Sequence, residues 1–299
     1  MAAQIRIGIS GWRYAAWRGV FYPPGLVQKN ELHFASRALS SVELNGSFYS
    51  LQRPDSYARW YAETPDDFIF SVKGPRFITH MKRLQDIEQP LANFFASGLF
   101  ELKEKLGPLL WQLPGNFSFD LTRIEAFLKQ LPRDTEAAAR IAGRCDERMH
   151  GRCQLHIDAC RPIRHALEIR HPSFANTAFI DLLRQHNVAL VVADTAGRWP
   201  YYEDVTADFI YVRLHGDEEL YASSYSDDAL SRWASRIQSW TNGGQPADAQ
   251  LIAPGQEPPQ RSARDLYCYF DNDTKVHAPF DADRLCVRLG LKNTPFLRA

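Results

Sequence analysis

The sequence has no excess of charge of either sign, because 35 lysines and arginines balance 35 aspartates and glutamates. Total charge therefore does not draw the chain to nucleic acid or to an anionic membrane, although a local basic patch is still compatible with it. No run of about 18 apolar residues is present, so we expect no transmembrane helix. The opening MAAQIRIGIS lacks a basic segment followed by an apolar stretch, so we expect no signal peptide and a cytoplasmic location.

Cysteine is scarce, and its spacing forms no framework. The odd count of five argues against a secreted scaffold held by disulfides. The region 145–160 combines cysteine with histidine but lacks the compact paired spacing of a zinc finger, so we expect no structural zinc there. The cysteines are Cys145, Cys153, Cys160, Cys268 and Cys286.

Short apolar runs rich in β-branched and aromatic residues recur along the whole chain. Eight of them have the length and composition of buried parallel strands. Helical patterns lie between most of them, and this alternation predicts βαβ units and a parallel sheet. The predicted strands are 5–10, 41–46, 68–73, 107–113, 165–170, 188–194, 209–214 and 265–271. The predicted helices are 29–40, 54–63, 90–106, 121–131, 176–187, 227–241 and 281–289.

Eight such units in one chain of this length predict a single (β/α)8 barrel domain spanning residues 1–299. An open doubly wound sheet would favour a G-x-G-x-x-G turn after the first strand, and none is present there. Pro54 suits a first helical turn, and Asn176 and Asp281 suit helix N-caps. Residues 195–208 contain no convincing helix, and 243–264 has the composition of a dispensable surface loop.

Polar residues gather at one alternate set of positions near the ends of the strands. Because side chains alternate across a strand, residues two apart share a face. The intervening positions are mostly apolar and suit the helix side, so we expect the polar set to converge on the barrel axis at the C-terminal mouth. The set comprises Glu43, Asn45, Ser71, Lys73, Gln112, Glu168, Arg170, Asp194, Tyr211, Arg213, His215 and either Asp271 or Asn272.

These charges also have a purely structural interpretation. Glu168 with Arg170, or Glu43 with Lys73, would form ion pairs within the barrel interior. Burial of so many charges without a use is nevertheless costly, which favours a functional site. Aromatic residues crowd the first loop, where Trp17, Phe21 and Tyr22 are expected to pack together, whereas Trp12 is open to ligand contact.

Seven motif-like stretches run from the first predicted strand to the eighth. They are GWRYAAWRGVFYP (11–23), ELNGSFY (43–49), FSVKGPRFITH (70–80), GPLLWQLP (107–114), ALEIRHPSF (166–174), YVRLHG (211–216) and YFDND (269–273). These stretches resemble one known family, the YecE-like barrels catalogued as domain of unknown function 72, and the resemblance implies a TIM-type barrel without implying a reaction. Three positions depart from the family pattern: Gly74 replaces the commoner alanine of VKAPR, Gly115 replaces a second proline, and Asp271 replaces an asparagine.

The residue types at the expected mouth favour an anionic ligand, because arginine and lysine bind phosphate or carboxylate oxygens. The leading hypothesis is therefore a hydrolase or lyase that acts on a small phosphorylated or carboxylated sugar-like molecule. Proton transfer is assigned to Glu168 and His215, with Glu43 and Asp194 orienting them. Substrate binding is assigned to Lys73, Arg76, Arg170, Arg213, Trp12, Asn45 and Gln112.

Three alternatives stay open at the level of sequence. A divalent metal could be held by Glu43, Glu168, Asp194 and His215, although the basic residues would compete with it, so no metal ligands are assigned. By analogy with barrel endonucleases, the chain could bind or repair nucleic acid, against which its zero net charge counts. The third alternative is a barrel that binds a ligand without catalysis. The sequence specifies no cofactor.

Overall fold

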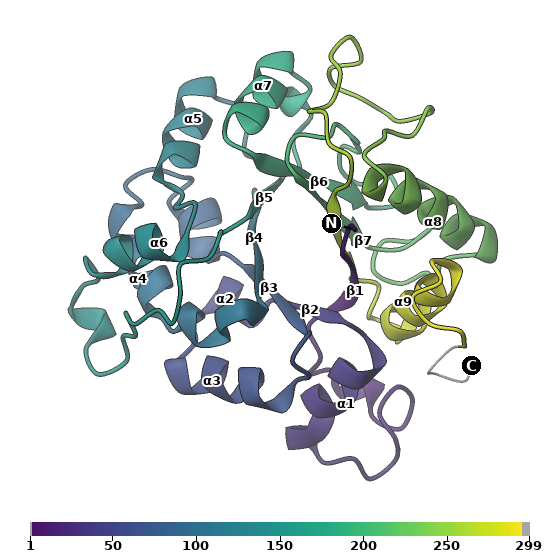
Figure 1. Ribbon diagram of the computed structural model, residues 1–299, viewed down its shortest axis with the longest axis horizontal. Coiled ribbons are helices and arrows are strands. Elements are labelled where there is room, and N and C mark those ends of the chain that lie inside the picture. Colours follow the sequence, from purple (N-terminus) through teal and green to yellow (C-terminus); the bar gives the residue numbers. More distant parts are fainter. Residues whose placement is uncertain (1, 295–299) are drawn as a thin grey trace. The chain divides into compact units, whose positions relative to one another are not determined.

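The computed structural model describes residues 2–294. Its eight strands form a closed barrel in sequence order, with parallel neighbours, as the alternation of strands and helices predicts (Figure 1). Every predicted strand is present, and the boundaries differ by at most two residues. The strands are β1 (Ile5–Ser10), β2 (Ser41–Leu44), β3 (Ile69–Lys73), β4 (Leu106–Gln112), β5 (His165–Glu168), β6 (Val188–Asp194), β7 (Phe209–Leu214) and β8 (Asp265–Phe270).

The chain divides into two compact units. The first contains the residues up to Val42 and those from Ala175 onward, and the second contains Glu43–Phe174. The expectation of one domain over the whole chain stays a prediction. Within the part that the structure describes, no helix is both long enough and apolar enough to cross a membrane.

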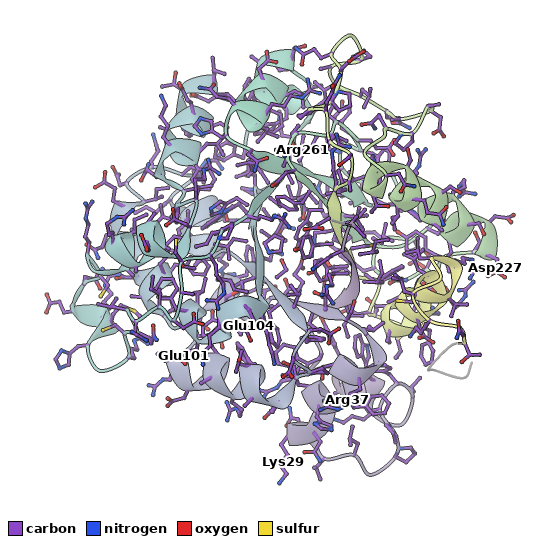
Figure 2. All side chains as sticks on the ribbon, in the orientation of Figure 1. Lys29, Arg37, Glu101, Glu104, Asp227 and Arg261 are labelled. Carbon is purple, nitrogen blue, oxygen red and sulfur yellow. The ribbon has the colours of Figure 1, made fainter. Side chains whose placement is uncertain are left out.

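Three strand pairs of the first unit are in continuous register, with β1 on β8, β8 on β7 and β7 on β6. Their helices lie outside the strands in Figure 1, and charged side chains such as Lys29, Arg37 and Asp227 point away from the strands in Figure 2. As predicted, residues 195–208 contain no helix or strand. The helices of this unit are α1 (Glu31–Ala38), α7 (Thr177–Gln185), α8 (Asp227–Thr241) and α9 (His277–Arg288).

Aromatic residues of the first loop pack as a small core, as the sequence predicts. Trp17, Phe21 and Tyr22 are at most 2% exposed, and the ring of Trp17 meets that of Phe21 edge-on at 5.3 Å. The Tyr22 hydroxyl donates to the carbonyl of Trp12 over 2.6 Å, which fixes the start of this loop after β1. Trp12 is itself 7% exposed.

The second unit contains β3, β4 and β5, and it corrects one helix prediction. The pattern over 90–106 predicts one helix, but α4 ends at Ala96 and a 3-10 helix covers Leu99–Lys105. Gly98 separates them with φ 113°, and a Cβ there would lie 2.5 Å from the Cα of Pro54. Both the positive φ and the close approach to Pro54 require glycine. The helix therefore ends before Gly98, although the hydrophobic spacing alone predicts that it continues. The helices of this unit are α2 (Gly46–Tyr49), α3 (Pro54–Glu63), α4 (Glu88–Ala96), α5 (Leu121–Gln130) and α6 (Thr135–Ala142).

The capping assignments are partly confirmed. Pro54 opens α3, and the Asn176 side chain accepts from the Ala178 N–H at the start of α7. The assignment of Asp281 as an N-cap is wrong, because α9 begins at His277 and Asp281 is buried within it. Its carboxylate accepts from the Tyr225 backbone N–H. The side chain that the local pattern predicts to cap a helix therefore makes a tertiary hydrogen bond instead.

The segment 243–264 has no regular secondary structure, but buried carboxylates anchor it. Asp204, which is 3% exposed, accepts from the N–H groups of Ile252 at 2.7 Å and Ala253 at 3.0 Å. Glu203 accepts from the Gln250 N–H at 2.9 Å. The composition predicts a dispensable excursion, whereas these contacts make the segment part of the packed structure.

We predict that Asp204→Ala lowers the free energy of unfolding by about 2–4 kcal/mol, because it leaves two N–H groups, one of them buried, without their acceptor. Urea denaturation followed by circular dichroism measures the change. The matched control Asp248→Ala removes a 78% exposed carboxylate of the same segment and should cost less than about 1 kcal/mol. Equal, small losses in both variants would support the dispensable loop instead.

Candidate functional site: polar clusters at the strand ends

Except for Arg76, which lies three residues beyond β3, the polar residues assigned to the site lie on the last two positions of a strand or one to two residues beyond it. Lys73, Gln112 and Glu168 are the final residues of β3, β4 and β5. All three are buried, with Glu168 only 1% exposed. They belong to the second unit, whereas Arg213, His215 and Asp194 belong to the first. Each unit therefore carries its own polar cluster.

Glu168 is the centre of the cluster in the second unit. Gln112 stands beside it in the pairing of β4 with β5, and its amide nitrogen donates to both carboxylate oxygens at 2.9 and 3.0 Å. Arg170 donates from Nε to the same carboxylate at 2.8 Å. The predicted pair of Glu168 with Arg170 is thus confirmed. Both oxygens of Glu168 accept hydrogen bonds, which favours the ionised carboxylate.

His80 lies among the cations of this cluster. Burial, followed by the positive charges of Lys73, Arg170 and Arg76, lowers the pKa of His80 to about 4, against an opposing effect of Glu168. The imidazole is therefore neutral at physiological pH. Its Nδ1 lies 2.9 Å from the Thr79 hydroxyl, and no described residue is bonded to Nε2.

A short π-helix, Phe77–Met81, places His80 in this position. The ring of Phe48, from α2, meets His80 edge-on at 5.1 Å and carries the ammonium of Lys73 over its face at 4.4 Å. π-helical turns of this kind are frequent at functional sites. Phe48 thus supports both a cation and the neutral imidazole.

The glycine at position 74, where the family pattern has alanine, is explained by the packing around it. A Cβ at this position would lie 2.4 Å from two ring atoms of Trp111, closer than a real contact allows. Trp111 is fully buried, and its indole N–H donates to Nδ1 of His165 at 3.1 Å. The glycine therefore makes room for Trp111 directly after the strand that carries Lys73.

The cluster of the first unit centres on Asp271. Arg213, fully buried, donates to this carboxylate at 2.9 Å, and Nδ1 of His215 lies 3.0 Å from it, at ion-pair distance but without the alignment of a hydrogen bond. Arg213 also lies 3.3 Å from Nε2 of His215. Because a guanidinium only donates, Nε2 accepts and the His215 proton belongs on Nδ1, which faces Asp271.

Asp194, at the end of β6, accepts from the Tyr225 hydroxyl at 3.0 Å. Burial raises the pKa of Asp194, and the Tyr225 hydrogen bond opposes that effect. Burial and the charge of Asp271 likewise raise the pKa of Asp273 to about 6. Two carboxyl groups of this unit therefore hold their protons more tightly than free aspartate does.

The remaining assigned polar residues are Glu43, Asn45 and Arg76. Glu43 is fully buried on β2, and Asn45 is half-buried with an Oδ1 that has no hydrogen-bond partner among the described residues. Arg76 is exposed and lies 5.6 Å from the Tyr49 ring centre. The expected convergence of Glu43, Lys73, Glu168, Arg213 and His215 on one point stays a prediction.

Sequence reasoning missed His80 and assigned no role to Asp271. His80 ends the stretch FSVKGPRFITH, so its position in that motif was the available signal. Asp271 was offered only as an alternative to Asn272, yet it contacts both Arg213 and His215. Among residues 2–294, no group of three or more His, Cys, Asp or Glu side chains has an arrangement suited to a metal ion.

A family model described as "Protein of unknown function DUF72" matches residues 6–299. The chain therefore belongs to this family, as its seven motifs indicate. The UPF0759 protein YecE of Escherichia coli K12 is 30% identical over 130 residues, which are 43% of this chain and 45% of YecE. The UPF0759 protein YunF of Bacillus subtilis is 30% identical over 116 residues, 37% of this chain and 40% of YunF. Each match spans less than half of the relative's length.

Two solved structures of the family share the fold. A DUF72 family protein from Thermotoga maritima has a TM-score of 0.68 at 24% identity and covers 96% of this chain and 99% of its own. A DUF72 family protein from Enterococcus faecalis has a TM-score of 0.68 at 16% identity, with 97% and 96% covered. At these identities the likeness concerns the fold alone.

The low pKa of His80 predicts a specific pH dependence of stability. An unfolded histidine titrates near 6.5 and folded His80 near 4, so the unfolded chain binds the extra proton between these values. This contribution lowers the free energy of unfolding as the pH falls from about 6.5 to about 4, and His80→Asn should remove it.

Urea denaturation of wild type and His80→Asn at several pH values measures the difference, with His33→Asn, an exposed histidine on α1, as the matched control. Asparagine at position 80 keeps an amide near the Thr79 hydroxyl. If wild type and His80→Asn lose stability in parallel over this range, the imidazole titrates as an ordinary histidine and the cation cluster does not act on it.

Proposed function

We propose that the chain is an enzyme, of hydrolase or lyase type, that acts on a small phosphorylated or carboxylated substrate. The single observation that carries this proposal is the position of the half-buried His80 imidazole, whose Nε2 has no hydrogen-bond partner among the described residues and whose pKa is lowered by burial and by the charges of Lys73, Arg170 and Arg76. Neutral imidazoles beside cations suit proton transfer to or from a bound anion.

Lys73, Arg76 and Arg170 hold the anion in this proposal. Arg76 is exposed and has no carboxylate partner among the described residues, so its guanidinium is available to phosphate or carboxylate oxygens. Arg170 is aligned by Glu168, and Glu168 by Gln112. Glu168 therefore acts as a positioning residue, since both of its oxygens are already engaged.

His80 is the proton acceptor that the contacts favour over His215. Nε2 of His215 accepts from Arg213, and the ring is fully buried with Nδ1 3.0 Å from Asp271, whereas the His80 ring is only half-buried. A bound anion neutralises part of the charge around His80 and raises its pKa toward neutrality. The imidazole then becomes an effective base only when the substrate is present. Asp271 positions Arg213 and His215 within the first unit.

The anion-binding part of the proposed function predicts that phosphate or sulfate raises the melting temperature of the protein in a saturable manner. Mass action adds about 2.7 kcal/mol at a hundredfold excess over Kd, whereas general salt exclusion grows without saturation. Arg76→Met should weaken the saturable part without unfolding the protein. The double variant Arg170→Met with Glu168→Gln should do the same, because it removes both members of a buried pair.

Differential scanning fluorimetry across phosphate, sulfate and acetate measures this response, with Arg140→Met, an exposed arginine on α6, as the control. Catalysis is tested by incubating phosphorylated and carboxylated sugars with wild type and His80→Asn and following products by NMR. His80→Asn should retain anion binding and lose turnover. A wild type without any saturable response to these anions contradicts the proposal.

A further inference from the structure

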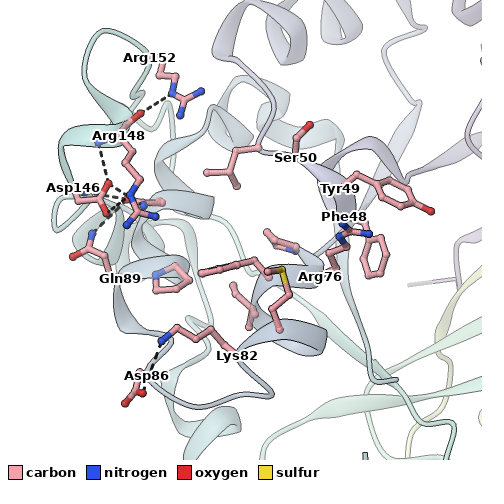
Figure 3. Close-up of a pocket in the computed structure, with 17 residues that line it drawn as sticks. Phe48, Tyr49, Ser50, Arg76, Lys82, Asp86, Gln89, Asp146, Arg148 and Arg152 are labelled. Atoms are coloured by element: carbon pink, nitrogen blue, oxygen red, sulfur yellow. Dashed lines mark hydrogen bonds and ion pairs between the residues drawn. The ribbon is translucent and has the colours of Figure 1, made fainter. Parts of the chain in front are cut away.

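A cavity in the second unit adjoins the proposed anion site. This cavity, of about 460 Å³, opens beside Phe48 and Arg76, the two residues that it shares with the His80 cluster. Figure 3 shows Phe48 and Arg76 on one side of this cavity and Arg148 with Arg152 on the other. The cavity therefore begins at the proposed anion site and ends at another pair of arginines.

The far end carries positive charge that the chain only partly neutralises. Arg148 lies 3.6 Å from Asp146, a contact between a 76% exposed guanidinium and a carboxylate that also accepts from Asn93. Arg152 donates from Nε to the Arg148 carbonyl at 2.8 Å and has no carboxylate partner among the described residues. Only one of these two guanidiniums, that of Arg148, lies near a carboxylate, so together they leave a site suited to an anionic group.

Apolar side chains form part of the wall between the two ends. Met81, which is 64% exposed, and Phe77, which is 38% exposed, both line the cavity and offer it adjacent apolar surface. Lys82 on the rim is only loosely paired with Asp86 at 3.9 Å. Besides Phe48, the apolar residues lining the cavity are Leu51, Pro75, Phe77, Ile78, Met81 and Pro90.

We infer that the substrate is elongated, with an anionic group at each end and an apolar chain between them. The first anionic group binds at Lys73, Arg76 and Arg170, the chain lies along Met81 and Phe77, and the second anionic group meets Arg148 and Arg152. This inference rests on the proposed function, since its first anchor is the proposed anion site. It replaces a compact sugar-like substrate by one that fills the cavity.

The test uses isothermal calorimetry with inorganic phosphate, n-alkyl phosphates of increasing length, and the same chains ending in a carboxylate or in an ammonium group. Affinity should rise about two- to fourfold per methylene that reaches the cavity. The terminal carboxylate should add about fivefold at the length that spans the cavity, and the ammonium group should lower affinity.

Variants separate the two ends. Arg152→Met should remove the gain from the terminal carboxylate and keep the gain from the chain, whereas Met81→Gln should reduce the gain per methylene. Arg140→Met, which does not line the cavity, should change neither. If phosphate binds but neither chain nor carboxylate adds affinity, the inference is overturned and the proposed anion site stands. If no phosphate compound binds, the proposed function fails and this inference fails with it.

Discussion

The concentration of positive charge around one half-buried imidazole is the constraint on which the candidate site depends. Burial lowers the pKa of His80 most, followed by the charges of Lys73, Arg170 and Arg76, and the carboxylate of Glu168 opposes them without restoring an ordinary value. Glu168 is itself committed to Gln112 and Arg170. The cluster is thus built to keep the imidazole neutral and the cations in place, and a bound anion changes both properties at once.

Much of the barrel could be predicted from the sequence because parallel strands buried on both faces consist of short apolar runs with recognisable ends. The same alternation predicts that Lys73, Gln112 and Glu168 lie near the ends of their strands, and each is the last residue of its strand. The confirmed pair of Glu168 with Arg170 follows from their spacing, since residues two apart share a face.

What the sequence did not reveal depends on contacts between distant residues. Helix α4 ends where Gly98 packs closely against Pro54. The hydrophobic periodicity of the sequence contains no signal of this contact. Asp281 resembles an N-cap locally, but the backbone N–H of Tyr225 uses its carboxylate. His80 follows a strand in a π-helix, a geometry that apolar spacing does not signal, and only its neighbours make its pKa unusual. The alternation along the eighth strand did not separate Asp271 from Asn272, and only the contacts of Asp271 with Arg213 and His215 identify it.

The most direct measurement of the central claim is an NMR titration of the His80 imidazole with and without saturating phosphate. The free protein should show a pKa of about 4 for His80. Phosphate should raise that pKa toward its ordinary value in wild type, and the rise should be smaller in Arg76→Met, because fewer cations then hold the anion. A His80 pKa near 6.5 in the free protein, or one that phosphate leaves unchanged, would contradict the account.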